Sequence, residues 1–234
     1  MTLGTVPRVI DAAVLCPHPP LLLRELGGAQ DAAAELRHDA VRAVRALVEG
    51  ASSVVVVGGD DVGRTWDPST PVDVRRFGTT GAAPSRPGLP LSLGVGVRLL
   101  AEAGWQGPVE TVALPWDGEG VDALAEELAG RPAGTVLLVL GDGSTRRGDK
   151  APGYLDERAF PFDDAVAKAL ADADAHTLHT LDTALAAELM VLGAASFRLL
   201  GAVGLRTGVS SATLDHRSDP FGVSWFVATW RLGR

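Results

Sequence analysis

Three short apolar runs that end abruptly in small and acidic residues constrain the fold of this chain more than any other feature. Residues 9–15, 54–57 and 136–140 consist almost wholly of aliphatic side chains, and they run into Cys-Pro-His-Pro-Pro, Gly-Gly-Asp-Asp and Gly-Asp-Gly-Ser-Thr. Short runs without a polar face are typical of strands that are buried on both sides of a parallel sheet. Because ligands bind at the carboxyl ends of such strands, these three polar ends predict a site.

Segments with helical periodicity separate the apolar runs. We expect helices over residues 29–49, 92–103, 120–129 and 163–192, the last continuing through 197–203. A further strand is expected over residues 109–114, and a terminal hairpin over 209–214 and 223–230. This alternation predicts a single α/β domain over residues 1–234, with a central mixed, mainly parallel sheet flanked by helices. Residues 58–90, rich in Gly and Pro, are expected to form a long loop with a short edge strand at 72–77.

Composition excludes several classes of function. The net charge of −8 disfavours nucleic acid as a partner, because phosphate binding needs a basic surface. A lone cysteine rules out an intramolecular disulfide and favours a reducing compartment. No run approaches the ~20 apolar residues that a membrane helix needs. We therefore expect a cytoplasmic protein without a membrane partner, and a homodimer as the commonest assembly.

His18 is the first candidate for chemistry, because prolines on both sides fix the backbone where the first strand ends. Such an imidazole could bind a metal or act as a general base; alternatively, the segment simply turns the chain. Asp60 and Asp61 end the second strand. Their carboxylates could bind a hard cation or orient a histidine, or they could form an ordinary acidic turn.

The third polar end offers groups that suit an anion. Asp142, Ser144 and Arg146 lie in a glycine-rich segment whose N–H groups, hydroxyls and guanidinium could cradle a carboxylate. No Gly-x-Gly-x-x-Gly follows any predicted strand, which disfavours a nucleotide. His176 and His179 could share one helical face as metal ligands, although a solvated surface is the favoured interpretation.

Three segments together resemble the class III extradiol ring-cleavage dioxygenases, namely the protocatechuate-type, LigB-like catalytic subunits and their Memo-like relatives. They are AAVLCPHPPLLL, VVVVGGDD and VLLVLGDGSTRRGDKAPGYLDERAFPFD, and the ending SDPFGVSWFVATWRL is similar too. The resemblance implies a LigB-like α/β fold that acts on a small aromatic or carboxylated molecule. It also implies Fe(II) held by two histidines and a glutamate, with a further histidine as acid–base.

Carried over by position, the resemblance places His18 as the first iron ligand. Asp60 occupies the place of the second histidine, and Glu188 is the nearest substitute for the glutamate. Thr145 stands where the family has its acid–base histidine, so that His18 and Thr145 are the implied catalytic positions. Asp142, Ser144 and Arg146 are the implied substrate contacts. With one of the four family positions intact, the resemblance implies altered chemistry or loss of catalysis, and either Fe(II), another divalent metal or no metal.

Two alternatives to a metal-dependent dioxygenase-like enzyme stay open. One is a non-catalytic protein that binds a metabolite or a partner on the same fold, which predicts an enclosed cleft without a metal or a broad apolar patch at an interface. The other is a divalent-cation-dependent hydrolase, which requires Asp60, Asp61 and Asp142 to cluster. A metal site in the family's position requires His18, Asp60 and Glu188 to converge on one point.

Overall fold

The computed structural model of the chain describes residues 10–27, 31–72, 74, 77 and 88–233. Its strands are β1 (Ala12–Cys16), β2 (Ser53–Asp60), β3 (Arg64–Trp66), β4 (Val109–Pro115), β5 (Thr135–Leu140), β6 (Val209–Ser218) and β7 (Trp225–Leu232). Its helices are α1 (Ala34–Val48), α2 (Leu91–Ala103), α3 (Val121–Ala129), α4 (Ala159–Asp172), α5 (Ala175–His179), α6 (Thr183–Glu188) and α7 (Ala194–Thr207). Two short 3-10 helices, η1 (Pro20–Leu22) and η2 (Arg24–Leu26), follow β1. Within the described residues, no helix combines the length and apolarity needed to cross a bilayer.

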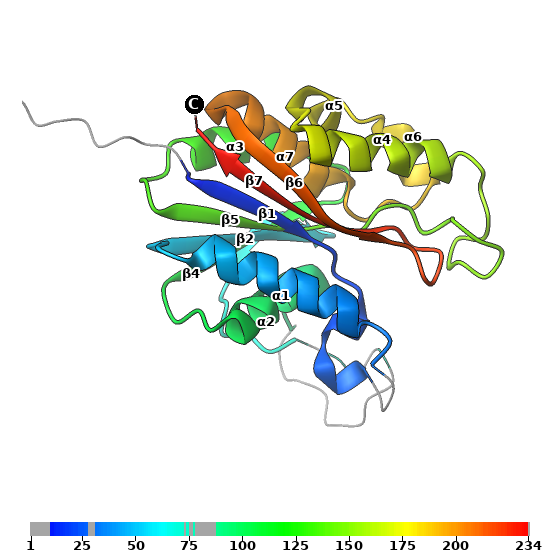
Figure 1. Cartoon of the computed structure of the whole chain (residues 1–234), viewed down its shortest axis with the longest axis horizontal. Helices are drawn as coiled ribbons and strands as arrows, with labels where there is room; N and C mark the ends of the chain where they lie inside the picture. The colour runs from blue at the N-terminus through cyan, green and yellow to red at the C-terminus, as the bar shows by residue number, and fades with distance from the viewer. Residues whose placement is uncertain (1–9, 28–30, 73, 75–76, 78–87, 234) are drawn as a thin grey trace, which may run out of the picture.

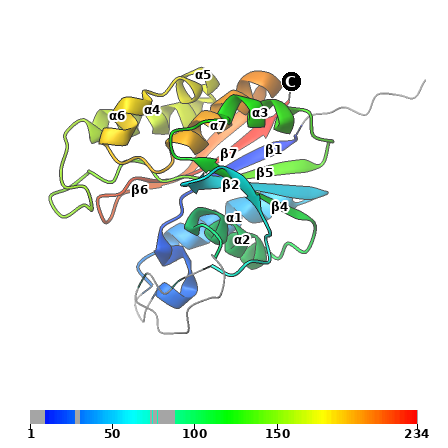
Figure 2. The same cartoon turned by 180° about the vertical axis from the view of Figure 1, so that it is seen from behind.

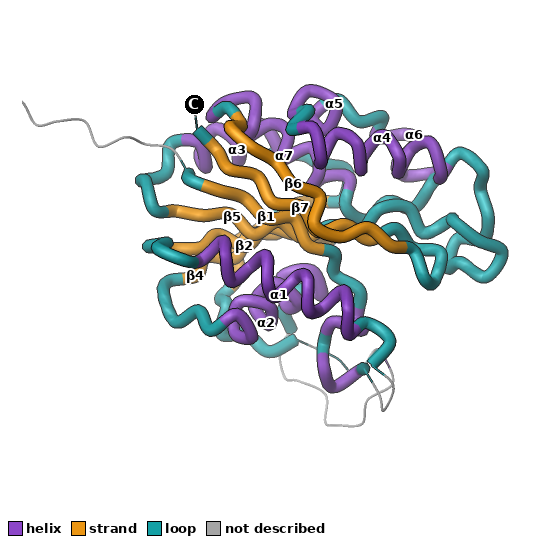
Figure 3. Tube along the Cα trace, viewed as in Figure 1, coloured by secondary structure: helices purple, strands orange, loops and turns teal. Residues whose placement is uncertain are grey.

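The strands of the described chain form one sheet in the order β3-β4-β2-β5-β1-β7-β6 (Figure 3). The four central strands β4, β2, β5 and β1 are parallel to one another. β3 and β7 pair antiparallel with the two ends of this group, and β6 completes a hairpin with β7. Every residue of β1 and of β5 is buried, as expected for strands covered on both faces. The predicted α/β fold with a mixed, mainly parallel sheet is confirmed.

Helices cover both faces of the sheet, and the strands divide their side chains between two cores. α1 and α2 lie on one face, whereas α3, α4, α5 and α7 lie on the other (Figure 1; Figure 2 from behind). Leu15 and Val57 point into the core under α7, and their neighbours Val14 and Val56 point into the core under α1 and α2. This alternation follows from the two-residue period of a strand. The apolar runs therefore specify both layers at once.

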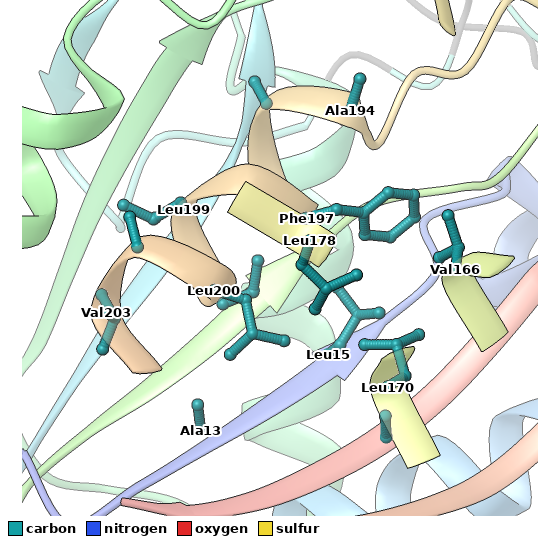
Figure 4. Packing of buried hydrophobic residues seen from close by; sticks show 14 of the residues in the cluster. Ala13, Leu15, Val166, Leu170, Leu178, Ala194, Phe197, Leu199, Leu200 and Val203 are labelled. Atoms are coloured by element: carbon teal, nitrogen blue, oxygen red, sulfur yellow. The ribbon is translucent and has the colours of Figure 1, made fainter. Parts of the chain in front are cut away.

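In the core under α7, the ring of Phe197 and aliphatic side chains of α7, α4, α5 and β1 pack together (Figure 4). Phe197, on the first turn of α7, has its ring centroid 6.2 Å from that of Phe226 on β7, in an edge-to-face arrangement. Trp230 is fully buried, and its indole N–H donates to the carbonyl of Leu170 over 2.8 Å. This packing holds the beginning of α7 against the carboxyl ends of the central strands.

The expectation of one long helix over residues 163–192 is wrong. The chain forms α4, α5 and α6 instead, because Ala173 adopts a left-handed φ of 59° directly after α4. The side chains of Asp174 and Asp182 then cap the next two helices by accepting from the backbone N–H of Thr177 and Leu185. Apolar periodicity continues through these breaks, which is why the pattern alone predicted one helix. α7 also extends well beyond the expected 197–203.

The expected loop over residues 58–90 contains more strand structure than the sequence indicated. β2 continues to Asp60, and β3 pairs with β4 at the edge of the sheet. Thr111 on β4 donates its hydroxyl to the carbonyl of Trp66 over 2.7 Å, and the guanidinium of Arg64 lies 3.7 Å from the Trp66 ring centroid. In place of the edge strand expected at 72–77, Val72 makes an isolated bridge to Leu89; residues 73, 75–76 and 78–87 lie outside the described chain.

Candidate functional site

Three of the predicted polar strand ends meet at one edge of the sheet. β1, β5 and β2 are neighbours and run parallel, so that His18, Asp142 and Asp60 emerge on the same side. His18 and Asp60 line one cavity of about 200 Å³, together with residues from the start of α2 and the end of β4. Asp142 lies behind His18. The sequence correctly predicted this edge as the place where polar groups gather.

The imidazole of His18 is buried and is backed by a carboxylate. Only 3% of the residue is exposed, and its backbone N–H donates to Asp142 Oδ1 over 2.8 Å. Its Nδ1 lies 3.8 Å from the same oxygen and, among the described residues, has no hydrogen-bond partner. Burial raises the pKa of Asp142, while the charge and the N–H of His18 act in the opposite direction. His18 is thus a fixed polar group at the back of the cavity.

The front of the cavity is formed by an aromatic ring and two carboxylates. Trp116 follows β4 and donates its indole N–H to Asp61 Oδ1 over 3.0 Å. The ring packs directly on the backbone of Gly59, where a Cβ would lie 2.0 Å from it. Ser92 donates its hydroxyl to the carbonyl of Gly59 over 2.8 Å. The Asp60 side chain, in contrast, makes no hydrogen bond to any described residue, which leaves it free to bind a ligand.

Close backbone packing holds the end of β5 in place. The N–H of Gly141 donates to the carbonyl of Cys16 over 2.9 Å, and the N–H of Gly193 donates to the carbonyl of Asp142 over 2.8 Å. A Cβ on Gly193 would lie 2.5 Å from that carbonyl oxygen. Because no side chain intervenes, the beginning of α7 fixes the position of Asp142. Cys16 itself is buried core, and burial raises the pKa of its thiol well above the usual range, with Asp215 contributing.

The implied metal set does not converge. Glu188 lies on α6, where its carboxylate accepts from Arg158 Nη1 over 2.6 Å and its side chain remains 58% exposed. It does not line the cavity of His18 and Asp60. Among the described residues, these three donors do not gather within 4.8 Å of one another. The residues present therefore do not fit Fe(II) or another divalent ion at this position, because the third ligand is engaged elsewhere.

The aspartate cluster that a cation-dependent hydrolase requires does not form either. Asp142 faces His18 behind the cavity, whereas Asp61 is bound by Trp116 at its front. In the described part of the chain, the oxygens of Asp60, Asp61 and Asp142 do not lie within 4.8 Å of one another. The Asp142 carboxylate accepts from His18 at the end of β1, which lies on the side of β5 away from β2, and this orientation separates it from Asp60 and Asp61.

The predicted substrate contacts Ser144 and Arg146 serve the structure of their own segment. The N–H and the hydroxyl of Ser144 donate to Asp163 over 3.0 and 2.5 Å. Arg146 donates its Nε–H to the carbonyl of Gly153 over 2.7 Å. Neither residue lines the His18 cavity. The structure therefore does not bring these two side chains to the His18 cavity, because they bond within their own segment.

Thr145, the implied acid–base position, is buried away from the cavity. Its N–H donates to the carbonyl of Leu189 over 3.2 Å, and its carbonyl accepts from the N–H of Gly153. The hydroxyl Oγ1 is buried and has no partner among the described residues. Since Thr145 does not line the cavity with His18, the structure does not bring the two implied catalytic residues together there.

Sequence reasoning missed a buried carboxylate and an aromatic wall. Asp163 is fully buried and accepts from Ser144 and from the Ser224 hydroxyl, the latter over 2.6 Å, with Arg147 Nη1 at 3.5 Å. Nothing in the local sequence distinguishes it from a surface acid of a helix. Trp116 could have been found, since it follows β4 and obeys the same rule as Asp60.

Two histidines outside the cavity, His179 and His216, contact aspartates. His179 Nε2 lies 3.1 Å from Asp122. Sequence reasoning took His216 as a surface or turn residue. One ring nitrogen of His216 and one carboxylate oxygen each of Glu35 and Asp39 lie within 4.8 Å of one another. Its Nδ1 is 2.9 Å from Asp39 Oδ2, and its Nε2 is 2.7 Å from the Ser218 hydroxyl. Both ring nitrogens thus have protein partners, and the imidazole links α1 to β6.

Comparisons with known proteins support the fold and leave the family unassigned. No protein-family model matches the chain, and no curated protein matches it. Among solved structures, it is similar to the crystal structure of the uncharacterised protein JW3007 from Escherichia coli K12. That similarity has a TM-score of 0.51 at 17% sequence identity, and it covers 94% of this chain and 99% of the other. At 17% identity, this similarity shows a shared fold over nearly the whole chain and nothing about function.

Proposed function

We propose that this protein binds a small neutral or cationic molecule in the His18 cavity, on a fold like that of the extradiol dioxygenases but without their iron-dependent ring cleavage. The observation that carries the proposal is the pairing of a buried, carboxylate-backed imidazole with the free carboxylate of Asp60 in one cavity of about 200 Å³. A concave site with a few convergent polar groups and apolar walls is the usual form of a small-molecule site.

The charge of the cavity favours a ligand with hydrogen-bond donors. Asp60 and Asp61 line it, whereas none of the described residues lining it is an arginine or a lysine. A carboxylate ligand would therefore meet like charges, and an amine or hydroxyl would meet acceptors. The Trp116 ring and Leu192 supply apolar contact. The group that enters this cavity is therefore a hydrogen-bond donor, and not the carboxylate that was expected to bind Arg146.

We propose the loss of ring cleavage because the residues that could bind iron are not gathered in this cavity. An iron site of the family's type needs two imidazoles and a carboxylate around open positions. His18 is the imidazole in this cavity, and Glu188 is paired with Arg158 on another surface. Thr145, in the place of the acid–base histidine, does not line the cavity. A positioned acid–base group is worth about 10²–10⁴ in rate, so its loss alone would disable the ordinary reaction.

A second candidate is an acid–base enzyme that uses His18 itself. The 3.8 Å separation of His18 Nδ1 from Asp142 Oδ1 is too long for a hydrogen bond, but catalytic bonds often tighten only when substrate binds. A buried carboxylate behind a histidine is the arrangement that orients an imidazole for proton transfer. In this case the bound amine or alcohol would be the proton donor.

The proposal is tested with three matched probes: benzylamine, benzyl alcohol and benzoate. NMR titration would follow the ring signals of His18 and the indole signal of Trp116 in the wild type and in Asp60→Asn, and the indole signal alone in His18→Ala. We expect the amine and the alcohol to shift both signals and benzoate to leave them unchanged. Asp60→Asn should weaken the amine about tenfold and the alcohol less, because it removes a charge-assisted bond. His176→Ala, at an exposed histidine of α5, is the control.

Two results would contradict the proposal. Tighter binding of benzoate than of benzylamine would show that the cavity selects anions. The second test loads the protein anaerobically with Fe(II), adds catechol or protocatechuate, and then admits O₂. Ring-opened product that forms with the wild type and is lost in His18→Ala would show a working dioxygenase.

A further inference from the structure

An apolar groove adjoins the His18 cavity. It has a volume of about 520 Å³ and lies between the end of β4, helix α6 and the beginning of α7. Small side chains form much of its lining, among them Ala184 and Ala187 of α6 and Ala194 of α7. Small residues on facing helices leave a channel that longer side chains would fill.

The groove and the cavity share two walls. Trp116 and Leu192 line both of them. A molecule that contacts these side chains in the cavity therefore lies next to the groove. The two hollows are adjacent parts of one surface.

The shared walls are unusually exposed for large apolar side chains. Trp116 is 39% exposed, and Met190 and Leu192 at the groove are each 43% exposed. Exposed apolar groups that gather in one hollow commonly mark a ligand site. Covering them with an apolar ligand would be favourable, because it removes apolar surface from water.

The groove is lined by one cation and one carboxylate, Arg198 and Asp117, whereas the described lining of the cavity contains carboxylates and no lysine or arginine. Arg198 of α7 lines the groove, and its Nε–H donates to the carbonyl of His179 over 3.3 Å. Among the described residues, no carboxylate forms an ion pair with its guanidinium. An anionic group at this end would thus meet an available charge-assisted donor.

We propose that the natural ligand is an elongated ω-amino or ω-hydroxy carboxylate: its donor group binds Asp60 and His18, its apolar chain lies in the groove, and its carboxylate binds Arg198. This inference rests on the proposed function, since the head group occupies the cavity described above. It adds the length and the polarity of the ligand, which follow from the shared walls and from the Arg198 guanidinium, which has no ion-pair partner among the described residues.

The test compares four probes by calorimetry: butylamine, octylamine, octanoate and ω-aminooctanoate. We expect octylamine to bind at least about tenfold more tightly than butylamine, because each fully buried methylene is worth about fourfold in affinity. ω-Aminooctanoate should gain about a further tenfold through its carboxylate. Octanoate should bind more weakly than ω-aminooctanoate, since it has no donor for Asp60.

Three variants assign these gains to the structure. Ala187→Trp fills the groove at an exposed position of α6 and should abolish the advantage of the longer amine. Ala46→Trp, at an exposed position of α1, is the matched control and should change nothing. Arg198→Gln should remove the gain from the carboxylate, and Arg198→Lys should restore part of it.

The outcomes separate this inference from the proposed function. Equal binding of butylamine and octylamine would show that the apolar chain does not lie in the groove. Tighter binding of octylamine that persists in Ala187→Trp would show the same. Neither result would contradict binding of the head group in the cavity. A carboxylate gain that survives Arg198→Gln would overturn the role of Arg198. Failure of every amine to bind in a His18- and Asp60-dependent manner would overturn the proposed function as well.

Discussion

The packing of α7 against the end of β5 allows a quantitative test of the site's architecture through Gly193→Ala. Gly193 has φ −95° and ψ 0°, a conformation that alanine tolerates, so that backbone strain does not decide the outcome. The added Cβ would lie 2.5 Å from the carbonyl oxygen of Asp142 and 2.8 Å from the ring of Phe197. Ordinary C···O contacts are about 3.3 Å or longer. The first turn of α7 must therefore move away from β5.

The cost has two parts. Overpacking a rigid site typically costs about 1–3 kcal/mol. The movement also weakens the hydrogen bond from the N–H of Gly193 to the carbonyl of Asp142, worth about 0.5–1.5 kcal/mol. We expect a loss of about 2–4 kcal/mol in the free energy of unfolding. At about 2.1 cal/mol/K of unfolding entropy per residue, this corresponds to a Tm lower by about 4–8 °C.

Differential scanning calorimetry or thermal circular dichroism would measure the change. Gly148→Ala is the matched control, because a Cβ there has nothing within 4 Å. Its Tm should stay within about 1 °C of the wild type. If Gly193→Ala and Gly148→Ala melt together at the wild-type temperature, α7 does not pack on β5 as described, and the placement of Asp142 behind His18 loses its support.

Three further predictions concern buried and paired carboxylates. Because burial raises the pKa of Asp142, the folded state holds its proton more tightly than the unfolded state, and stability falls as pH rises above about 4. In urea titrations, the free energy of unfolding of Asp142→Asn should therefore rise relative to that of the wild type as pH increases from 4 to 8. A difference between the two proteins that does not change with pH would contradict this. Asp163→Ala should cost at least about 3 kcal/mol, since it leaves buried donors without a partner, whereas Asp172→Ala at the exposed end of α4 should leave the urea midpoint nearly unchanged. Arg158 lowers the pKa of Asp156 to about 2, so that its contribution is present above pH ~4 and is lost as pH falls through about 2. The melting curves of wild type and Asp156→Asn should therefore differ at pH 6 and converge near pH 2.

Strands and layers of this protein could be predicted from local sequence, and most of the site's partners could not. An aliphatic run such as Val54 to Val57 carries the information for a strand buried on both faces, because burial acts on each side chain separately. The positions of His18 and Asp60 could also be predicted locally, because each follows the carboxyl end of a predicted strand, where ligands bind. The same rule would also have found Trp116, had it been applied to the strand before that residue.

Tertiary structure alone decided which charged groups meet. Glu188 and Asp163 look alike in the sequence as acids of helical segments, yet one is exposed with Arg158 and the other is fully buried beneath two serines. The left-handed turn at Ala173 and the caps that follow set the direction of α6, and thereby carry Glu188 away from His18. Ion pairs and hydrogen bonds depend on distances of a few ångströms between residues far apart in the chain, and only the folded arrangement fixes those distances.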